Sequence, residues 1–243
     1  MVIYDDGIQL NAVLEKPEGV DFCPLVILLH GFTSAMDRPH NLLAAAAIRD
    51  AGFATLRFDF NGHGRSSGAF RDMTVFSEIE DAAAFLQYAM SLPDATDIHL
   101  LGHSQGGVIA GMLAGYYHDK ISSLVMLTPA ASLKTDAQQG VCMGTKYDPK
   151  HIPETVQVGK SHAGGLYFRM AQHLPIYEVT GQFSGPALAV IGGMDTVVHP
   201  EDIRRYGEAM PHCRVVEYPA LDHGLFGADH AQMLREVVKF LQN

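Results

Sequence analysis

The sequence predicts an α/β protein built on one mostly parallel sheet with helices on both faces. Three observations lead to this fold class. Short apolar runs alternate with helix-like segments along most of the chain, as they do where helices connect parallel strands. The length of 243 residues suits one large domain, or a core with one modest insertion. An apolar fraction of 47% and a charged fraction of 18% are ordinary for a globular protein with a buried sheet.

The first half of the chain supplies most of the expected strands. Residues 8–14 alternate apolar and polar side chains, which is the pattern of a half-exposed edge strand. Residues 24–29 form an aliphatic run that ends at His30-Gly31, which indicates a strand buried on both faces. The other elements expected here are strands at 53–58, 98–101 and 121–127 and helices at 41–51, 74–91 and 108–117.

The regular alternation stops after the strand at 121–127. Residues 129–185 show no clean succession of strand and helix, and Gly, Pro, His and Gln are frequent. This stretch is too long for an ordinary loop, so we predict an inserted cap with its own short helices. The α/β core then comprises residues 1–128 and 186–243. Within the second part we expect strands at 187–191 and 214–218 and helices at 200–210 and 231–241.

Composition and charge exclude several classes of function. The net charge of −10 argues against nucleic-acid binding, because no excess of Lys and Arg is present to neutralise phosphates. The longest aliphatic run, 25–29, is far too short to span a bilayer, and the first residues show no secretory leader, so we expect a cytoplasmic protein. The three widely spaced cysteines, Cys23, Cys142 and Cys213, exclude a disulfide framework and a CxxC metal site. No other metal-binding spacing is visible.

The strongest chemical signal is Gly102-His103-Ser104-Gln105-Gly106, a G-x-S-x-G sequence between a predicted buried strand and a predicted helix. A very sharp strand-to-helix turn pushes its serine out in a strained conformation, where it can meet a base and a substrate. Side chains two residues to either side would collide in such a turn, which accounts for Gly102 and Gly106. We therefore predict Ser104 as a nucleophile, with the helix N-terminus favouring a developing oxyanion.

A second signal, His30-Gly31-Phe32-Thr33, follows a buried strand well upstream of Ser104. In this arrangement such a loop supplies one backbone N–H to the oxyanion hole, and the residue after the nucleophile supplies the other. We predict the N–H groups of Phe32 and Gln105 as this pair. We expect His30 to order the loop by hydrogen bonding rather than to bind metal, and Gly31 to permit close approach of the substrate.

The acid and the base are expected after the serine, in the order Ser, Asp, His. Asp195 follows the predicted strand at 187–191, and His223 follows the one at 214–218. Both loops leave the sheet at the same carboxyl edge as Ser104, where ligands bind in open α/β sheets. We predict His223 as the general base and Asp195 as the acid that orients it.

Other residues compete for these roles. Asp222 is the alternative acid, but side chains of adjacent residues seldom face each other. His63 precedes Ser104 and is not a candidate base; the loop around it, 59–66, is interpreted as a structural brace of the active-site edge. The remaining candidates for the base are His199, which is expected to open a helix, His212, which lies at the wrong end of its strand, and His230, which starts the last helix.

The chain resembles the α/β-hydrolase superfamily and, within it, the bacterial cinnamoyl (feruloyl) esterases. The resemblance runs over essentially the whole chain, through residues 6–12, the 30–33 loop, the 102–107 turn and the Asp195 and His223 loops. It includes four motifs of the insertion: Pro129-Ala130-Ala131, Tyr147-Asp148-Pro149, His151-Ile152-Pro153 and the segment 171–177. The resemblance implies the α/β-hydrolase fold with the cap inserted between the sixth and seventh strands, no cofactor, and a homodimer.

The same resemblance implies a serine carboxylesterase that cleaves esters of ferulic, p-coumaric or caffeic acid. Lys134, Asp136 and Tyr167 of the cap are then expected to contact the phenol, although each could equally be a solvated surface side chain. The expected partner is a small-molecule ester, with no nucleic acid, membrane or metal involved. Two alternatives stay open: a short-chain aliphatic or monoacylglycerol-type esterase, and a non-catalytic ligand-binding homologue.

Overall fold

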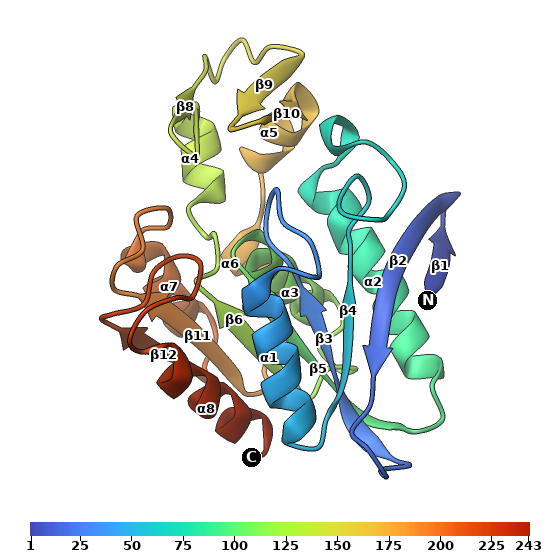
Figure 1. Cartoon of the computed structure of the whole chain (residues 1–243). Helices are drawn as coiled ribbons and strands as arrows, with labels where there is room; N and C mark the ends of the chain where they lie inside the picture. Colours follow the sequence, from blue (N-terminus) through green and yellow to red (C-terminus); the bar gives the residue numbers. More distant parts are fainter.

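A central sheet of eight strands organises the computed structural model, which describes all 243 residues (Figure 1). Its strand order is β1-β2-β4-β3-β5-β6-β11-β12. The β1–β2 and β2–β4 pairs are antiparallel and the others are parallel. The strands are β1 (Val2–Asp5), β2 (Ile8–Glu15), β3 (Cys23–Leu29), β4 (Ala54–Phe58), β5 (Ala95–His103), β6 (Ser123–Leu127), β11 (Ala187–Gly192) and β12 (Cys213–Tyr218). This architecture confirms the predicted mostly parallel sheet flanked by helices.

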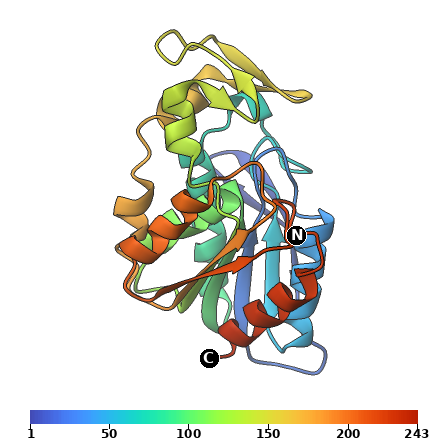
Figure 2. The ribbon, with the colours of Figure 1, turned by 90° about the vertical axis from the view of Figure 1, so that its left-hand side faces the viewer.

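Helices cover both faces of the sheet. Strand β3 shows why its aliphatic run is continuous: Leu25, Ile27 and Leu29 join a core cluster on one face, while Val26 and Leu28 join a second cluster on the other. Figure 2 shows α7 (orange) and α8 (red) on opposite sides of the sheet. The helices of the core are α1 (Pro39–Asp50), α2 (Val75–Ser91), α3 (Gln105–Tyr116), α7 (Pro200–Ala209) and α8 (His230–Leu241), with a 3₁₀ turn η1 (Phe70–Asp72) before α2.

The expectation that residues 8–14 form an edge strand was wrong. Strand β2 is the second strand of the sheet, and β1 pairs antiparallel with it at the edge. Asp6 and Gly7 form the two-residue turn between them, with φ angles of 45° and 81°. An Asp-Gly pair is a strong hairpin signal because both central positions of such a turn need positive φ. The signal was present in the sequence, but β1 has only four residues and gives little periodicity of its own.

The insertion lies between β6 and β11, which are the sixth and seventh strands of the main sheet in chain order. It stands above the carboxyl ends of the parallel strands in Figures 1 and 2. Two short antiparallel hairpins, which the sequence did not reveal, accompany its helices. Its last helix, α6, packs against the core helices α3 and α7. The elements of the insertion are α4 (Leu133–Gln139), β7 (Val141–Cys142), β8 (Thr145–Lys146), β9 (Thr155–Val158), β10 (Ser161–Gly164), α5 (Gly165–Ala171) and α6 (Ile176–Thr180).

The helices do not include a membrane-spanning segment. None of them combines the length and the mean hydropathy that crossing a bilayer requires.

Candidate active site

Ser104 occupies the sharp turn from β5 into α3. Its backbone has φ 56° and ψ −123°, a region that costs a non-glycine residue about 1–3 kcal/mol unless the surroundings impose it. Two close backbone approaches impose it here. A Cβ on Gly102 would lie 2.1 Å from the carbonyl oxygen of Gly106, and a Cβ on Gly106 would lie 2.3 Å from that of Leu29. Only glycine fits at either position, as the sequence argument expected.

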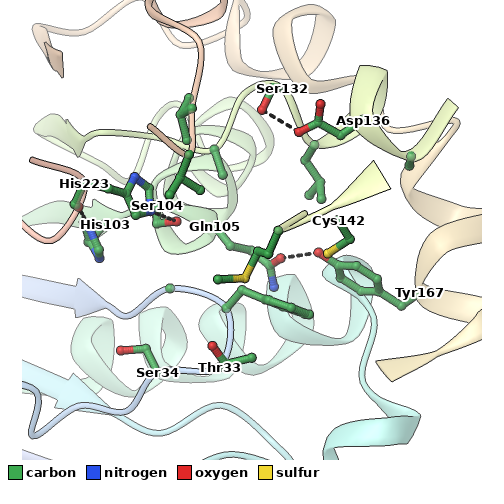
Figure 3. Close-up of a pocket in the computed structure, with 18 of the residues that line it drawn as sticks. Thr33, Ser34, His103, Ser104, Gln105, Ser132, Asp136, Cys142, Tyr167 and His223 are labelled. Atoms are coloured by element: carbon green, nitrogen blue, oxygen red, sulfur yellow. Dashed lines mark hydrogen bonds between the residues drawn. The ribbon is translucent and has the colours of Figure 1, made fainter. Parts of the chain in front are cut away.

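The structure brings Ser104, His223 and Asp195 together in one hydrogen-bonded chain (Figure 3 shows the serine and the histidine). His223 Nδ1 lies 2.8 Å from Asp195 Oδ2, and His223 Nε2 lies 3.0 Å from Ser104 Oγ. Because the carboxylate can only accept, Nδ1 carries the proton and Nε2 is free to accept from the serine hydroxyl. The buried Asp195 carboxylate is itself fixed, since its Oδ1 accepts the backbone N–H groups of Val197 (2.7 Å) and Val198 (3.0 Å).

The competing residues lie in other arrangements. Asp222 Oδ1 accepts the backbone N–H of Phe226 at 2.8 Å, so this carboxylate orders its own loop. His230 Nδ1 bonds to the carbonyl oxygen of Leu225 at 2.5 Å, at the start of α8. His199 is the N-cap residue of α7, as expected from the sequence. None of these side chains bonds to Ser104 or His223.

Two backbone N–H groups beside Ser104 are free. Neither Phe32 nor Gln105 donates its N–H to any acceptor in the protein, although most buried N–H groups are paired. Gly31 allows the loop that carries Phe32 to lie close to the serine, because a Cβ on Gly31 would lie 2.9 Å from Ser104 Cβ. Free donors of this kind, next to a nucleophile and at a helix N-terminus, can hold an oxyanion.

His30 braces the loop that carries Phe32. Its Nδ1 donates to the carbonyl oxygen of Gly31 at 2.9 Å, and its Nε2 accepts the N–H of Phe60 at 3.2 Å. Burial lowers the pKa of His30 to about 3, so the ring stays neutral and keeps this donor-acceptor pattern. The predicted role of His30 in ordering the loop therefore agrees with its contacts. The 59–66 loop is also a brace: Asp59 accepts the backbone N–H groups of Met36 and Arg65, both at 2.8 Å.

A cavity of about 290 Å³ opens over Ser104 and His223. The 30–33 loop and the start of α3 form one wall, and the insertion forms the other (Figure 3). The insertion contributes mainly apolar side chains, which are Ala130, Leu133, Ala137, Val141, Cys142, Met143 and Phe168. Burial raises the pKa of the Cys142 thiol to about 12, which leaves it as an apolar part of this wall.

Two of the three predicted cap residues line this cavity. Asp136 is half-buried, accepts a hydrogen bond from Ser132 Oγ (2.8 Å), and has its pKa raised by burial. Tyr167 is 1% exposed, so the alternative of a solvated surface side chain is wrong for it. Lys134 does not line the cavity. It lies two residues before Asp136 on α4, and side chains at that spacing point to nearly opposite sides of a helix.

Two buried residues that the sequence patterns did not single out, Glu78 and His103, support the site. Glu78 is fully buried, and its Oε2 accepts the side-chain Nε2–H of Gln105 at 2.5 Å. It sits on the apolar face of α2 with Val75 and Ile79, and a carboxylate at such a position was the signal available. His103 Nε2 lies 2.7 Å from the carbonyl oxygen of His223 and holds the loop of that residue. No three His, Cys, Asp or Glu side chains are grouped so that they could hold a metal ion.

The profile of the alpha/beta hydrolase fold family matches residues 24–146, which include the 30–33 loop and the Ser104 turn. The chain belongs to the α/β-hydrolase family. A solved structure with ferulic acid bound, Est1E from Butyrivibrio proteoclasticus, is similar to this α/β-hydrolase over its whole length. The two chains are 34% identical with a TM-score of 0.94, and the match covers 100% of this chain and 97% of that one. A second structure of Est1E gives 31% identity and a TM-score of 0.91 over the same shares.

Curated relatives match over shorter segments. The human monoacylglycerol lipase ABHD6 is 28% identical over 117 residues, which are 47% of this chain and 33% of the lipase. The human serine hydrolase-like protein is 29% identical over 157 residues, or 62% of this chain and 71% of that protein. This α/β-hydrolase thus spans about a third of the length of the lipase that it matches.

Proposed function

We propose that this α/β-hydrolase is a serine carboxylesterase that hydrolyses hydroxycinnamate esters (ferulate, p-coumarate or caffeate) through an acyl-enzyme. The observation that carries the proposal is the Asp195–His223–Ser104 chain, which faces a cavity with two free N–H groups beside the serine. These are the parts that acyl transfer needs: an activated nucleophile, an oriented base and an oxyanion hole.

In the first half-reaction His223 Nε2 removes the Ser104 proton as Oγ attacks the ester carbonyl. The N–H groups of Phe32 and Gln105 hold the oxygen on which negative charge develops. Asp195 keeps the proton of His223 on Nδ1 and stabilises the imidazolium that forms. The tetrahedral intermediate then breaks its bond to the alcohol, and His223 gives the proton to the departing oxygen.

In the second half-reaction water replaces the alcohol. His223 takes a proton from the water, whose oxygen attacks the acyl carbonyl, and the same two N–H groups hold the second oxyanion. Ser104 leaves as its proton returns from His223, and the free acid is released. No cofactor enters either step.

The apolar wall of the insertion favours a planar aromatic acyl group. A hydroxycinnamate has an apolar ring and a hydroxyl at its far end. The cavity offers apolar side chains for the ring and two polar ones, Asp136 and Tyr167, for the hydroxyl. Est1E, which is similar over the whole chain, holds ferulic acid in its solved structure. Lys134 has no part in the proposed phenol site, since it does not line the cavity.

The similarity to a monoacylglycerol lipase keeps an aliphatic ester as the second candidate substrate. A hydrolysis panel separates the two, with methyl ferulate, p-nitrophenyl butyrate and the amide analogue of methyl ferulate as substrates. The proposal expects the highest kcat/KM on methyl ferulate and none on the amide. A higher kcat/KM on the butyrate, with little turnover of ferulate, would favour the aliphatic esterase.

A non-catalytic binding homologue is separated by labelling of the serine. A fluorophosphonate probe should label the wild-type protein and leave Ser104→Ala unlabelled, and the same variant should lose kcat by about 10⁴ or more. Ser132→Ala is a matched control, because this serine lines the same cavity but bonds to Asp136 rather than to His223. Activity of Ser104→Ala within tenfold of wild type would mean that another group is the nucleophile.

The proposed phenol site has a test of its own. Asp136→Ala should reduce the preference for methyl ferulate over methyl cinnamate by about 1–3 kcal/mol, the scale for losing a polar partner of the substrate. Hydrolysis of p-nitrophenyl acetate, whose acyl group cannot reach the distal end, should change little. Equal losses on all three esters would mean that Asp136 supports the insertion and does not contact the phenol.

A further inference from the structure

Three buried side chains form a hydrogen-bonded chain behind the proposed acyl site. Glu78 Oε2 accepts from Gln105 Nε2 at 2.5 Å, and Tyr167 Oη donates to Gln105 Oε1 at 2.6 Å. The exposed fractions of the three residues are 1%, 2% and 1%. Figure 3 shows the second of these bonds at the end of the cavity away from His223. The proposed acyl transfer uses only the backbone N–H of Gln105, so this side-chain network has no part in it.

The hydrogen bonds of this Glu78–Gln105–Tyr167 chain have a fixed direction. A carboxamide has a donor end and an acceptor end, and the Glu78 oxygen fixes which end faces which neighbour. With Gln105 Nε2 turned to Glu78, Gln105 Oε1 faces Tyr167 and accepts the single hydroxyl proton of that tyrosine. The tyrosine oxygen can then offer the cavity a lone pair but no proton.

The ring of Tyr167 cannot easily turn away from this arrangement. It stacks on Phe32 with centroids 5.1 Å apart and meets Phe168 edge to face at 5.0 Å. Gln105 Oε1 is the acceptor of its hydroxyl. The direction of the Tyr167 hydrogen bond therefore depends on Glu78, which is bonded to the far end of the Gln105 side chain.

We propose that Glu78 is a positioning residue that, through Gln105, presents the Tyr167 oxygen as a hydrogen-bond acceptor and so selects acyl groups with a distal hydroxyl over the corresponding ethers. The inference rests on the proposed function. A para-hydroxyl shares its one proton between the Tyr167 oxygen and the Asp136 carboxyl, the two acceptors of the proposed phenol site. A para-methoxy group has no proton to give, so two acceptors meet in a buried place, which is costly.

The charge of Glu78 is not needed for this role. Burial, with a smaller contribution from Asp81, raises the pKa of Glu78 to about 8. The other nearby polar group is His63, whose Nδ1 lies 3.7 Å from Glu78 Oε1 but donates to the carbonyl oxygen of Asn61. A carboxyl that carries its proton on Oε1 still accepts at Oε2. A neutral amide at position 78 can accept in the same way, whereas a thioether sulfur is only a weak acceptor.

The experiment compares methyl p-coumarate with methyl 4-methoxycinnamate in wild type, Glu78→Gln and Glu78→Met. The ratio of the two kcat/KM values should fall about tenfold in Glu78→Met and stay near the wild-type value in Glu78→Gln. Glu80→Gln, an exposed position on the same helix, should leave both the ratio and the activity unchanged. A wild-type ratio in folded Glu78→Met, or an equal loss in both Glu78 variants, would overturn the inference.

Two further measurements keep the test decisive. If Glu78→Met does not fold, Gln105→Leu removes the middle member of the same hydrogen-bonded chain and must lower the same ratio. Binding of free p-coumarate and free 4-methoxycinnamate to Ser104→Ala, by calorimetry, reads the preference without turnover. A phenol preference in binding with no hydrolysis by wild type would refute the proposed function and support the inference. Hydrolysis of both esters at equal rates would support the proposed function and refute the inference.

Discussion

Replacement of Asp195 by asparagine tests the proposed triad most sharply. In the native site Asp195 Oδ1 accepts the N–H groups of Val197 and Val198, and Oδ2 faces His223 Nδ1. An asparagine that keeps its oxygen on the two N–H groups must turn its NH₂ toward His223. Donor then faces donor, the imidazole moves its proton to Nε2, and the base can no longer accept from Ser104.

The opposite amide orientation restores the right tautomer at the expense of both backbone hydrogen bonds. At about 1–3 kcal/mol for each unsatisfied group, the active arrangement lies about 2–6 kcal/mol higher. With about 1.4 kcal/mol for each factor of ten, kcat should fall by about 30-fold to 10⁴-fold. The same substitution in serine proteases lowers kcat by about 10⁴. Asp195 does not line the cavity, so KM should change little.

The assay is steady-state hydrolysis of methyl ferulate and p-nitrophenyl acetate, with circular dichroism to verify folding. Asp222→Asn is the matched control, because it changes the neighbouring carboxylate and leaves an oxygen to accept the N–H of Phe226. It should retain kcat within a few fold. A kcat for Asp195→Asn within tenfold of wild type, or a larger loss in Asp222→Asn, would refute this account of the triad.

Two predictions concern stability. Gly102→Ala should destabilise the fold severely, because its Cβ would lie 2.1 Å from a backbone oxygen. Gly207→Ala is the control, since the atom nearest to its Cβ is a movable methyl of Val215 at 3.0 Å. Soluble yield and urea midpoints compare the two variants, and equal stability would contradict the reasoning. Glu78 has its pKa raised from 4.5 to about 8 in the folded state, so its protonated form favours folding and the wild type should lose stability as pH rises between these values. Glu78→Gln lacks this loss, and its stability relative to wild type should increase from pH 5 to pH 8; a difference that does not change with pH would show that burial of the carboxyl has little effect.

The elements with strong local signals could be predicted from the sequence, and so could the residues that the site brings together. A buried parallel strand reads as an aliphatic run, and the Ser104 turn carries its own glycines. Because the carboxyl ends of parallel strands meet at one edge, the chain order of strands and loops is enough to assign Asp195 and His223 to the same edge as Ser104.

The parts that could not be predicted depend on contacts between distant segments. The link between Glu78 and Gln105 spans 27 positions, and the link between Gln105 and Tyr167 spans 62. Periodicity describes one segment at a time and says nothing of such pairs. Lys134 and Asp136 illustrate the same limit, because only the course of α4 decides which of them faces the cavity.

The insertion between β6 and β11 places the residues that form the acyl slot in a different part of the gene from the residues of the proposed triad. Ser104, Asp195 and His223 are encoded outside residues 129–185, while the apolar wall over them comes from a single continuous stretch within it. Mutations in that stretch can reshape the acyl slot without touching the residues proposed for bond breaking. One exchange of a contiguous gene segment could therefore retarget the enzyme, provided that the new segment still supplies a partner for the Gln105 side chain.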